Sequence, residues 1–254
     1  MNEKRSKILG LGIFLLLISL IIFLIYSPVK KNKNEIELID VSGNNLLSEL
    51  DYLTYTKLDD ISSYKNISLS IIKDRFEKHP YIELADVEFK RANEINVIVH
   101  EKTITAMLLS HSEQFFLSDK FQVLCLCPNT KFVDYPIISN LADENEIKLL
   151  SFLKSKDVME SFKIIESLKA VDTKLLNRLS EINVQKGGDI ILTFSGIKSD
   201  IKYGRGEAAK KMVYLETLFN NGIENQEILM RNDYIDLRFS NEIYIGNFER
   251  TDLL

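Results

Sequence analysis

One uncharged run near the start of the chain constrains the protein more than any other feature. From Ile8 to Tyr26 the sequence reads ILGLGIFLLLISLIIFLIY, with no charged residue over 19 positions. As an α-helix this run would span roughly 28 Å, close to the hydrocarbon thickness of a bilayer. We therefore expect a transmembrane helix over residues 8–26, preceded by a cytoplasmic tail of residues 1–7.

A cleavable signal peptide is the alternative to a membrane anchor. The apolar run is longer than the usual signal-peptide core of about 7–15 residues, and no Ala-x-Ala-like cleavage site follows it. These features favour an anchor. Basic residues flank both ends of the run equally, so the positive-inside rule does not set its orientation. A short tail before a large C-terminal part is typical of a signal anchor that exports the C-terminal part.

Charge is unevenly distributed along the chain. Six basic residues bracket the apolar run: Lys4, Arg5, Lys7, Lys30, Lys31 and Lys33. Removing residues 1–33 takes away these six and one acidic residue, which changes the formal net charge from −5 to −10. Residues 34–254 are therefore acidic and would be repelled by phosphate backbones. This argues against nucleic acid as a partner. The segment SPVKKNKN at 27–34 is polar and basic, which predicts a linker beside the membrane.

Residues 35–104 are predicted to form a small α+β domain. Turn residues and apolar periodicity give the order strand, helix, helix, strand, strand. The second helix should end before His79-Pro80, because a proline disfavours helical backbone in the residue before it. The predicted elements are strands at 35–41, 86–90 and 95–101, and helices at 46–53 and from Ser68 onward.

Residues 105–254 are predicted to form a larger mixed α+β domain with a mainly antiparallel sheet. Alternating apolar residues and turn signals such as Lys186-Gly187-Gly188-Asp189 mark the strands, and helical spacing marks the helices. The predicted helices cover 141–153, 157–170 and 206–220. The predicted strands cover 106–109, 114–117, 122–126, 180–185, 190–194, 199–203, 234–239 and 242–245.

The residues that would carry catalysis or bind metal are few. The three histidines, His79, His100 and His111, stand in no spacing known from hydrolases or zinc enzymes. Cys125 and Cys127 in LCLCP would lie on one face of a strand, where a bridge across one residue is strained. They are also a poor zinc site, so we interpret them as small apolar strand residues. The sequence predicts no catalytic residue, no metal site and no cofactor.

Five stretches resemble the FtsQ/DivIB cell-division proteins, which are single-pass membrane proteins with a POTRA domain followed by a β domain. They occur in the family's order: IELIDVSGNNLLS at 36–48, HPYIELADVEFK at 79–90, INVIVHEKTITA at 95–106, IKYGRGEAAKKM at 201–212 and YIDLRFSNEIYIG at 234–246. The chain departs from the family at Ile104 and at Asn93-Glu94, where proline is often found. These departures affect turn rigidity.

The resemblance implies a non-enzymatic divisome scaffold in the cell (inner) membrane at the division septum, with its C-terminal part outside the cytoplasm. It implies FtsB/FtsL-type coiled-coil partners, bound through the C-terminal strands, and a link to septal cell-wall synthesis. An open strand edge suits this role, because a partner strand can add to it. The residues carried over are Arg205, Arg238, Phe239, Ile243 and Tyr244. The predicted edge strand, Glu242 to Ile245, adds Glu242 and Ile245 to the partner-binding residues.

Each of these residues also has a purely structural interpretation. Arg205 would solvate a turn, Arg238 would point outward from a strand, and Phe239 and Tyr244 would complete the core. Two other functions remain open. A signal-anchored cell-envelope hydrolase would need a catalytic pocket. A POTRA-bearing transport accessory protein would show repeated POTRA units or a membrane β-barrel.

Overall fold

The structure, a computed structural model, describes residues 13–23, 35–111, 113–131, 134–142, 147–220 and 234–246. The chain divides into two compact units, residues 1–35 and residues 36–254. Residues 13–23 are helical, and nowhere in the described ranges is a helix both long and apolar enough to cross a membrane. The predicted span at 8–26 extends beyond the described helix on both sides. The predicted tail at 1–7 and linker at 27–34 lie outside the described residues.

The second unit begins with a three-stranded sheet in the order β1-β3-β2. β1 runs parallel to β3, and β2 runs antiparallel to it. The predicted order of strand, helix, helix, strand, strand is observed, with one short extra helix, α3. The elements are β1 (Leu38–Ser42), α2 (Glu49–Thr56), α3 (Ile61–Tyr64), α4 (Leu69–Glu77), β2 (Ile82–Arg91) and β3 (Glu94–Glu101).

The loop between β1 and α2 is held by local chemistry. Gly43 has a φ of +81°, and a Cβ added to it would collide with the carbonyl oxygen of Val99, so only glycine fits. The carboxylate of Glu101 accepts hydrogen bonds from the N–H groups of Asn45 (2.9 Å) and Leu46 (3.0 Å). It also accepts one from the Tyr52 hydroxyl (2.6 Å). The end of β3 therefore anchors the loop that leaves β1.

The remaining strands form one nine-stranded sheet in the order β12-β11-β10-β9-β8-β7-β4-β5-β6. Most neighbours are antiparallel, as predicted, but β7 is parallel to both β4 and β8, and β11 is parallel to β10. The strands are β4 (Ile104–Ser110), β5 (Glu113–Ser118), β6 (Val123–Cys125), β7 (Ile137–Ser139), β8 (Leu179–Asn183), β9 (Ile190–Phe194), β10 (Asp200–Gly204), β11 (Tyr234–Asp236) and β12 (Tyr244–Gly246).

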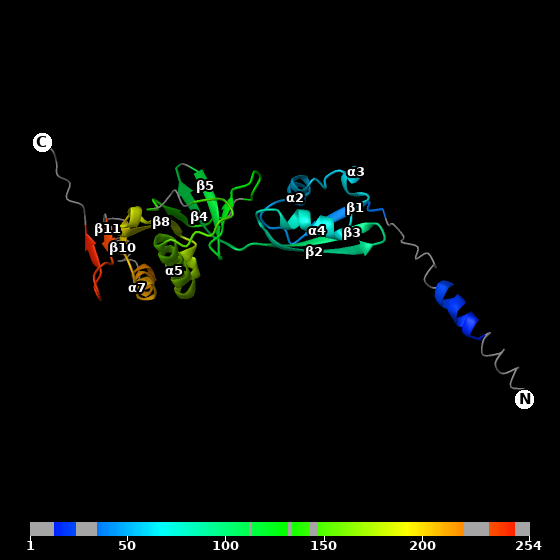
Figure 1. Ribbon diagram of the computed structural model, residues 1–254. Coiled ribbons are helices and arrows are strands. Elements are labelled where there is room, and N and C mark those ends of the chain that lie inside the picture. Colours follow the sequence, from blue (N-terminus) through cyan, green and yellow to red (C-terminus); the bar gives the residue numbers. More distant parts are fainter. Residues whose placement is uncertain are drawn as a thin grey trace, which may run out of the picture. The chain divides into compact units, whose positions relative to one another are not determined.

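Two long helices cover this sheet. α5 (Lys156–Val171) and α7 (Ala208–Asn220) pack against each other, and α6 (Thr173–Leu176) follows α5 (Figure 1). Ser155 caps α5, because its hydroxyl accepts a hydrogen bond from the Val158 N–H (3.3 Å). The apolar faces predicted for both helices contribute Val158, Ile165, Leu168, Met212 and Leu215 to the core between helices and sheet. The mixed α+β class is confirmed.

The predicted helix at 141–153 is wrong over the residues that the structure describes there. Residues 147–153 are not helical, and Leu150 has a left-handed φ of +62°. Their backbone bonds along the outer side of β6 instead: the Val123 N–H donates to the Ser151 carbonyl and the Leu150 N–H to the Val123 carbonyl. Helical periodicity alone did not reveal that these backbone groups pair with a distant strand. Residues 143–146 lie outside the described ranges.

Two cores lie within residues 36–254. Side chains of the three-stranded sheet and its helices form one, and side chains of the large sheet form the other. Phe116 on β5 and Leu124 on β6 belong to the first core, although their strands belong to the large sheet. The predicted domain boundary between residues 104 and 105 remains a prediction, because residues 36–254 form a single compact unit.

Candidate partner-binding site

β12 forms one edge of the nine-stranded sheet. It pairs antiparallel with β11, with Asp236 opposite Tyr244 and Ile235 opposite Ile245. Within the described ranges no strand lies on its other side. A strand in this position offers backbone N–H and C=O groups to a further strand.

The direction of each backbone group on β12 follows from the ladder next to it. The Leu237 N–H donates to the Lys202 carbonyl on β10 (2.9 Å), so the backbone of Leu237 faces β10. Directions alternate along a strand, so Asp236 faces β12 and its opposite residue, Tyr244, faces β11. The same alternation turns the N–H and C=O of Ile245 toward the open side. Ile245 therefore carries the groups that an added strand would bond.

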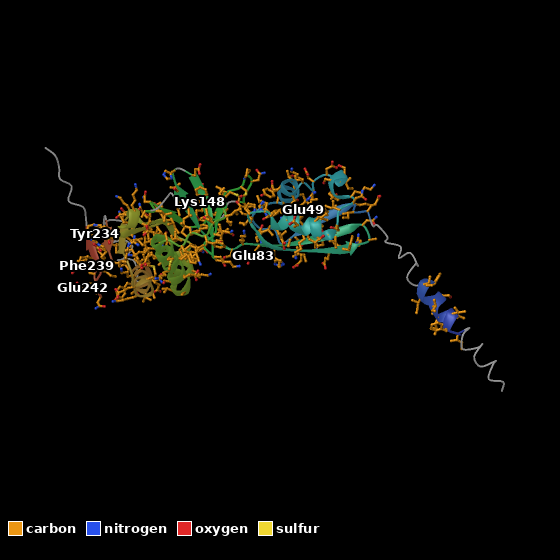
Figure 2. All side chains as sticks on the ribbon, in the orientation of Figure 1. Glu49, Glu83, Lys148, Tyr234, Phe239 and Glu242 are labelled. Carbon is orange, nitrogen blue, oxygen red and sulfur yellow. The ribbon has the colours of Figure 1, made fainter. Side chains whose placement is uncertain are left out.

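Aromatic side chains lie exposed beside this edge. Phe239 and Tyr244 make an edge-to-face contact with ring centroids 4.6 Å apart, and their exposed fractions are 51% and 48%. The Tyr244 hydroxyl donates to the Glu242 carboxylate (2.6 Å). Ile243 is partly buried against the large core, whereas Ile245 is exposed. Figure 2 labels Phe239 and Glu242 in this region, together with Tyr234 of β11. These side chains give the edge an apolar contact surface with a polar rim.

Arg238 is held by two carboxylates of its own chain. Its guanidinium donates to Asp236 through Nε and Nη2 (2.9 and 2.6 Å) and to Asp189 through Nη1 (2.9 Å). Burial by itself would raise the pKa of Asp236, but the hydrogen bonds from Arg238 lower that pKa below its ordinary value. The side chain of Arg238 nevertheless stays 41% exposed. Arg238 therefore has partners within its own chain and also keeps part of its side chain exposed to solvent.

Arg205 lies further inside. Its Nη2 donates to Asp157 at the start of α5 (2.7 Å), and its Nε donates to the Gly188 carbonyl (2.8 Å). The side chain is only 20% exposed, and that of Asp157 only 7%. Nη1 of Arg205 is buried with no hydrogen-bond partner in the described part of the chain. The residue joins the turn before α7 to the start of α5.

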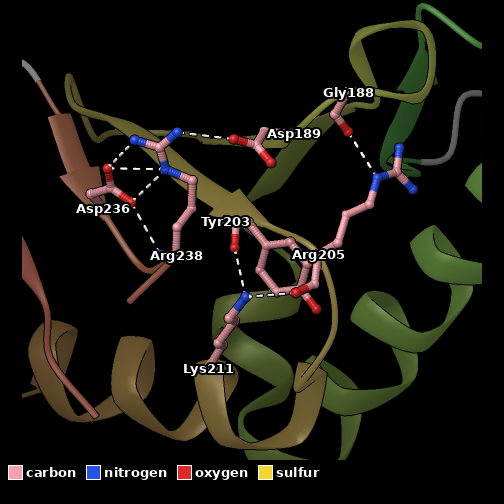
Figure 3. A network of polar contacts seen from close by, with 7 residues as sticks. All are labelled: Gly188, Asp189, Tyr203, Arg205, Lys211, Asp236 and Arg238. Carbon is pink, nitrogen blue, oxygen red and sulfur yellow. Dashed lines mark hydrogen bonds and ion pairs between the residues drawn. The ribbon is translucent and has the colours of Figure 1, made fainter. Parts of the chain in front are cut away.

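Residues 188 and 189 link the two arginines that the sequence singled out. Figure 3 shows Gly188 bonded to Arg205 and the adjacent Asp189 bonded to Arg238. Gly204, next to Arg205, has a φ of +69°, and a Cβ added to it would lie 2.7 Å from Cγ of Arg238. The structure therefore brings both arginines into one network behind the open edge.

Lys211 is a member of this network that the sequence analysis missed. It is buried on α7, and its ammonium donates to the carbonyls of Tyr203 (2.8 Å) and Arg205 (3.0 Å). Burial lowers the pKa of Lys211 below its ordinary value. The signal was present, because position 211 falls on the same helical face as Ala208 and Leu215. A lysine on the buried face of a helix indicates that backbone carbonyls nearby accept hydrogen bonds from its ammonium.

No three histidine, cysteine, aspartate or glutamate side chains gather to hold a metal within the described ranges. His79 is buried among tyrosines, and His100 is exposed next to Asp86.

The chain is similar to a known cell-division protein. No family model matches the chain. The cell division protein FtsQ of Geotalea daltonii is 22% identical over 213 residues, which cover 83% of this chain and 75% of the relative. The aligned region is long enough to include most of the folded part described above. This distant match supports the predicted resemblance of the chain to the FtsQ/DivIB cell-division proteins.

Proposed function

We propose that this chain is a non-enzymatic scaffold of the cell-division machinery that binds FtsB/FtsL-type coiled-coil membrane proteins through β12. The observation that carries the proposal is the edge of β12, which has no further strand beside it in the described part of the chain and where Ile245 turns its N–H and C=O outward. The similarity to a cell division protein supports a role of this chain in cell division. The uncharged run at 8–26 supports a single-pass membrane anchor. The resemblance to the FtsQ/DivIB proteins is what supports a folded part outside the cytoplasm, at the septum.

The chemistry of the edge suits an added strand. Backbone hydrogen bonds along β12 would supply affinity, and side-chain contacts would supply selectivity. Phe239 and Tyr244 form an exposed aromatic pair of the kind that dominates binding energy at interfaces. Arg238 keeps an exposed portion that suits an acidic group on the partner. Glu242 and Ile243 lie between the two aromatic residues in the sequence and directly precede Tyr244.

Arg205 has a different part in the proposal. Because its guanidinium is occupied by Asp157 and Gly188, we assign it a positioning role. It holds the turn that supports Gly204, and Gly204 contacts Arg238. Its effect on a partner would therefore pass through Arg238 and the sheet.

Replacing Ile245 with proline tests the added strand. Proline removes the N–H that faces the open side, so a partner strand loses a hydrogen bond at the centre of its contact. We expect the affinity of the full-length chain for the FtsB-type protein of the same organism to fall at least about tenfold. Titration of the two purified proteins in detergent measures this change.

Ile245→Thr is the matched control. Threonine keeps the backbone N–H and the branched shape, so this variant should bind within about threefold of the parent chain. Equal affinity for Ile245→Pro and Ile245→Thr would remove the open edge from the binding site. Near-ultraviolet circular dichroism of both variants checks that the sheet is intact.

A further inference from the structure

Two thiols meet where β6 ends. Cys125 is the last residue of β6, and Cys127 follows two residues later, outside the strand. Their Sγ atoms lie 3.2 Å apart, and both cysteines are free. A disulfide bond is about 2.05 Å long, so the sulfurs need to approach by roughly 1.2 Å to form one. Two small apolar strand residues were expected here, but only Cys125 lies on the strand, and Cys127 lies beyond its end.

The backbone holds each cysteine independently of the other. Cys125 pairs with Phe115 in the β5–β6 ladder. The Cys127 N–H donates to the Tyr81 hydroxyl (2.8 Å), and the Cys127 carbonyl accepts from the Thr130 hydroxyl (2.6 Å). Anchored in this way, the two thiols have a high effective concentration toward each other.

The pair is accessible from solvent. Both cysteines are partly exposed. Cys127 also lines a cavity of about 230 Å³ together with Met107, Phe116 and Lys131. This cavity gives a reagent of low molecular weight access to the Cys127 side of the pair.

The two thiols differ in their surroundings. Burial, followed by the neighbouring Cys125 sulfur, raises the pKa of the Cys127 thiol to about 12. Cys127 is therefore a thiol at neutral pH and a poor first nucleophile. On this ground we assign the first attack to Cys125 and the second to Cys127, an order that the serine variants below test.

We propose that Cys125 and Cys127 form a redox-active dithiol site whose substrate is a disulfide of low molecular weight. Cys125 loses its proton to solvent, and its thiolate attacks one sulfur of the substrate. The substrate S–S bond breaks, and the first released thiolate takes up a proton from solvent. The mixed disulfide on Cys125 is then attacked by Cys127, whose proton passes to the departing second thiolate. The protein loses two electrons and two protons, and the substrate is reduced to two thiols.

The disulfide between Cys125 and Cys127 would be readily reversible. A ring closed over one intervening residue is strained, and strained disulfides are readily reduced by thiols. The site therefore exchanges with its surroundings, in contrast to a structural disulfide that forms once.

Oxidised glutathione is the probe that tests the proposal. The reduced full-length chain, purified in detergent, is incubated with mixtures of reduced and oxidised glutathione and quenched with acid. Free thiols are then alkylated, and the intact mass is measured. The parent chain should lose both thiols without retaining glutathione. Cys127→Ser and Cys125→Ser should each stop at a glutathione adduct, with the Cys127→Ser adduct forming at least about tenfold faster.

Several outcomes would overturn the proposal. They are a parent chain that keeps both thiols, one that stops at a glutathione adduct, one that cross-links to a second chain, and equal adduct rates in the two serine variants. Alanine variants at both positions repeat the measurement in case a buried serine hydroxyl lowers stability. Far-ultraviolet circular dichroism confirms that the compared variants are folded.

Discussion

At the scale of single residues, His79 shows most clearly how burial changes a side chain. Its exposed fraction is 1%, and its ring packs against Tyr52, Tyr55 and Tyr81 with centroid distances of 4.3–5.3 Å. Nδ1 accepts a hydrogen bond from the Tyr81 N–H (3.1 Å), while Nε2 is buried with no hydrogen-bond partner in the described part of the chain. Burial, with a smaller effect of Lys102, lowers the pKa of His79 to about 4.

This depressed pKa predicts a loss of stability in acid. Unfolded chains protonate the imidazole near its ordinary pKa of 6.5, but folded chains keep it neutral down to about pH 4. The unfolded state therefore binds more protons in this window, and the free energy of unfolding falls as pH falls through it. The contribution of His79 should be about 3 kcal/mol between pH 7 and pH 4, measured by urea unfolding.

His79→Asn provides the comparison. The asparagine side chain keeps an acceptor for the Tyr81 N–H but does not titrate. The variant should be less stable at pH 7, because it loses contacts with the tyrosine rings, yet its stability should depend less on pH. Parallel pH curves for the two proteins would contradict the assignment. Carboxylates that titrate in the same range are common to both and cancel in the difference.

At the scale of elements, the turn between β10 and α7 decides how the candidate site is supported. Gly204 and Gly206 have φ values of +69° and +72°, so both adopt the left-handed backbone that glycine allows. They differ in their surroundings. A Cβ on Gly204 would press on Arg238, whereas one on Gly206 would meet nothing within 4 Å. Arg205 lies between them.

Alanine at each glycine separates backbone strain from side-chain collision. Gly206→Ala should lower the free energy of unfolding by about 1–2 kcal/mol, which is the cost of left-handed backbone. Gly204→Ala should lower it by about 1 kcal/mol more, because the added methyl displaces Arg238 from Asp189 and Asp236. Urea unfolding of the two variants measures the difference. Equal losses would mean that Arg238 is not packed against this turn.

At the scale of the whole molecule, residues 36–254 form a compact unit of their own. Their buried side chains fill two cores, and Phe116 and Leu124 connect the large sheet to the smaller core. The proposed anchor lies outside this compact unit. Folding and membrane attachment are therefore expected to be separable properties of the chain.

Removing residues 1–34 tests that separation. The shortened chain, beginning at Glu35, should unfold at the same urea midpoint as the full-length chain, because both buried cores remain complete. Only the full-length chain should float with phospholipid vesicles in a density gradient, since it alone keeps the uncharged run at 8–26. A lowered midpoint, or flotation of the shortened chain, would contradict this division of roles.

Much of the fold and of the candidate site could be predicted from the sequence. Helices α5 and α7 have apolar residues at helical spacing, and β3 alternates apolar and polar residues. The local sequence pattern therefore predicts which of their side chains are buried. These helices and this strand depend on periodicities of two or 3.6 residues, which any short window of sequence displays. The edge residues from Phe239 to Ile245 came instead from the family resemblance, and their role in binding stays a prediction.

Tertiary structure alone decided the rest. The parallel strand β7, the non-helical residues 147–153 and the inward turn of Arg205 toward Asp157 depend on groups far away in the chain. So do the pairing of Arg238 with Asp189 and the direction of the Ile245 N–H. A local pattern records whether a residue is buried, but its hydrogen-bond partner is chosen only when distant segments pack. Burial is a property of one position, whereas pairing is a property of two.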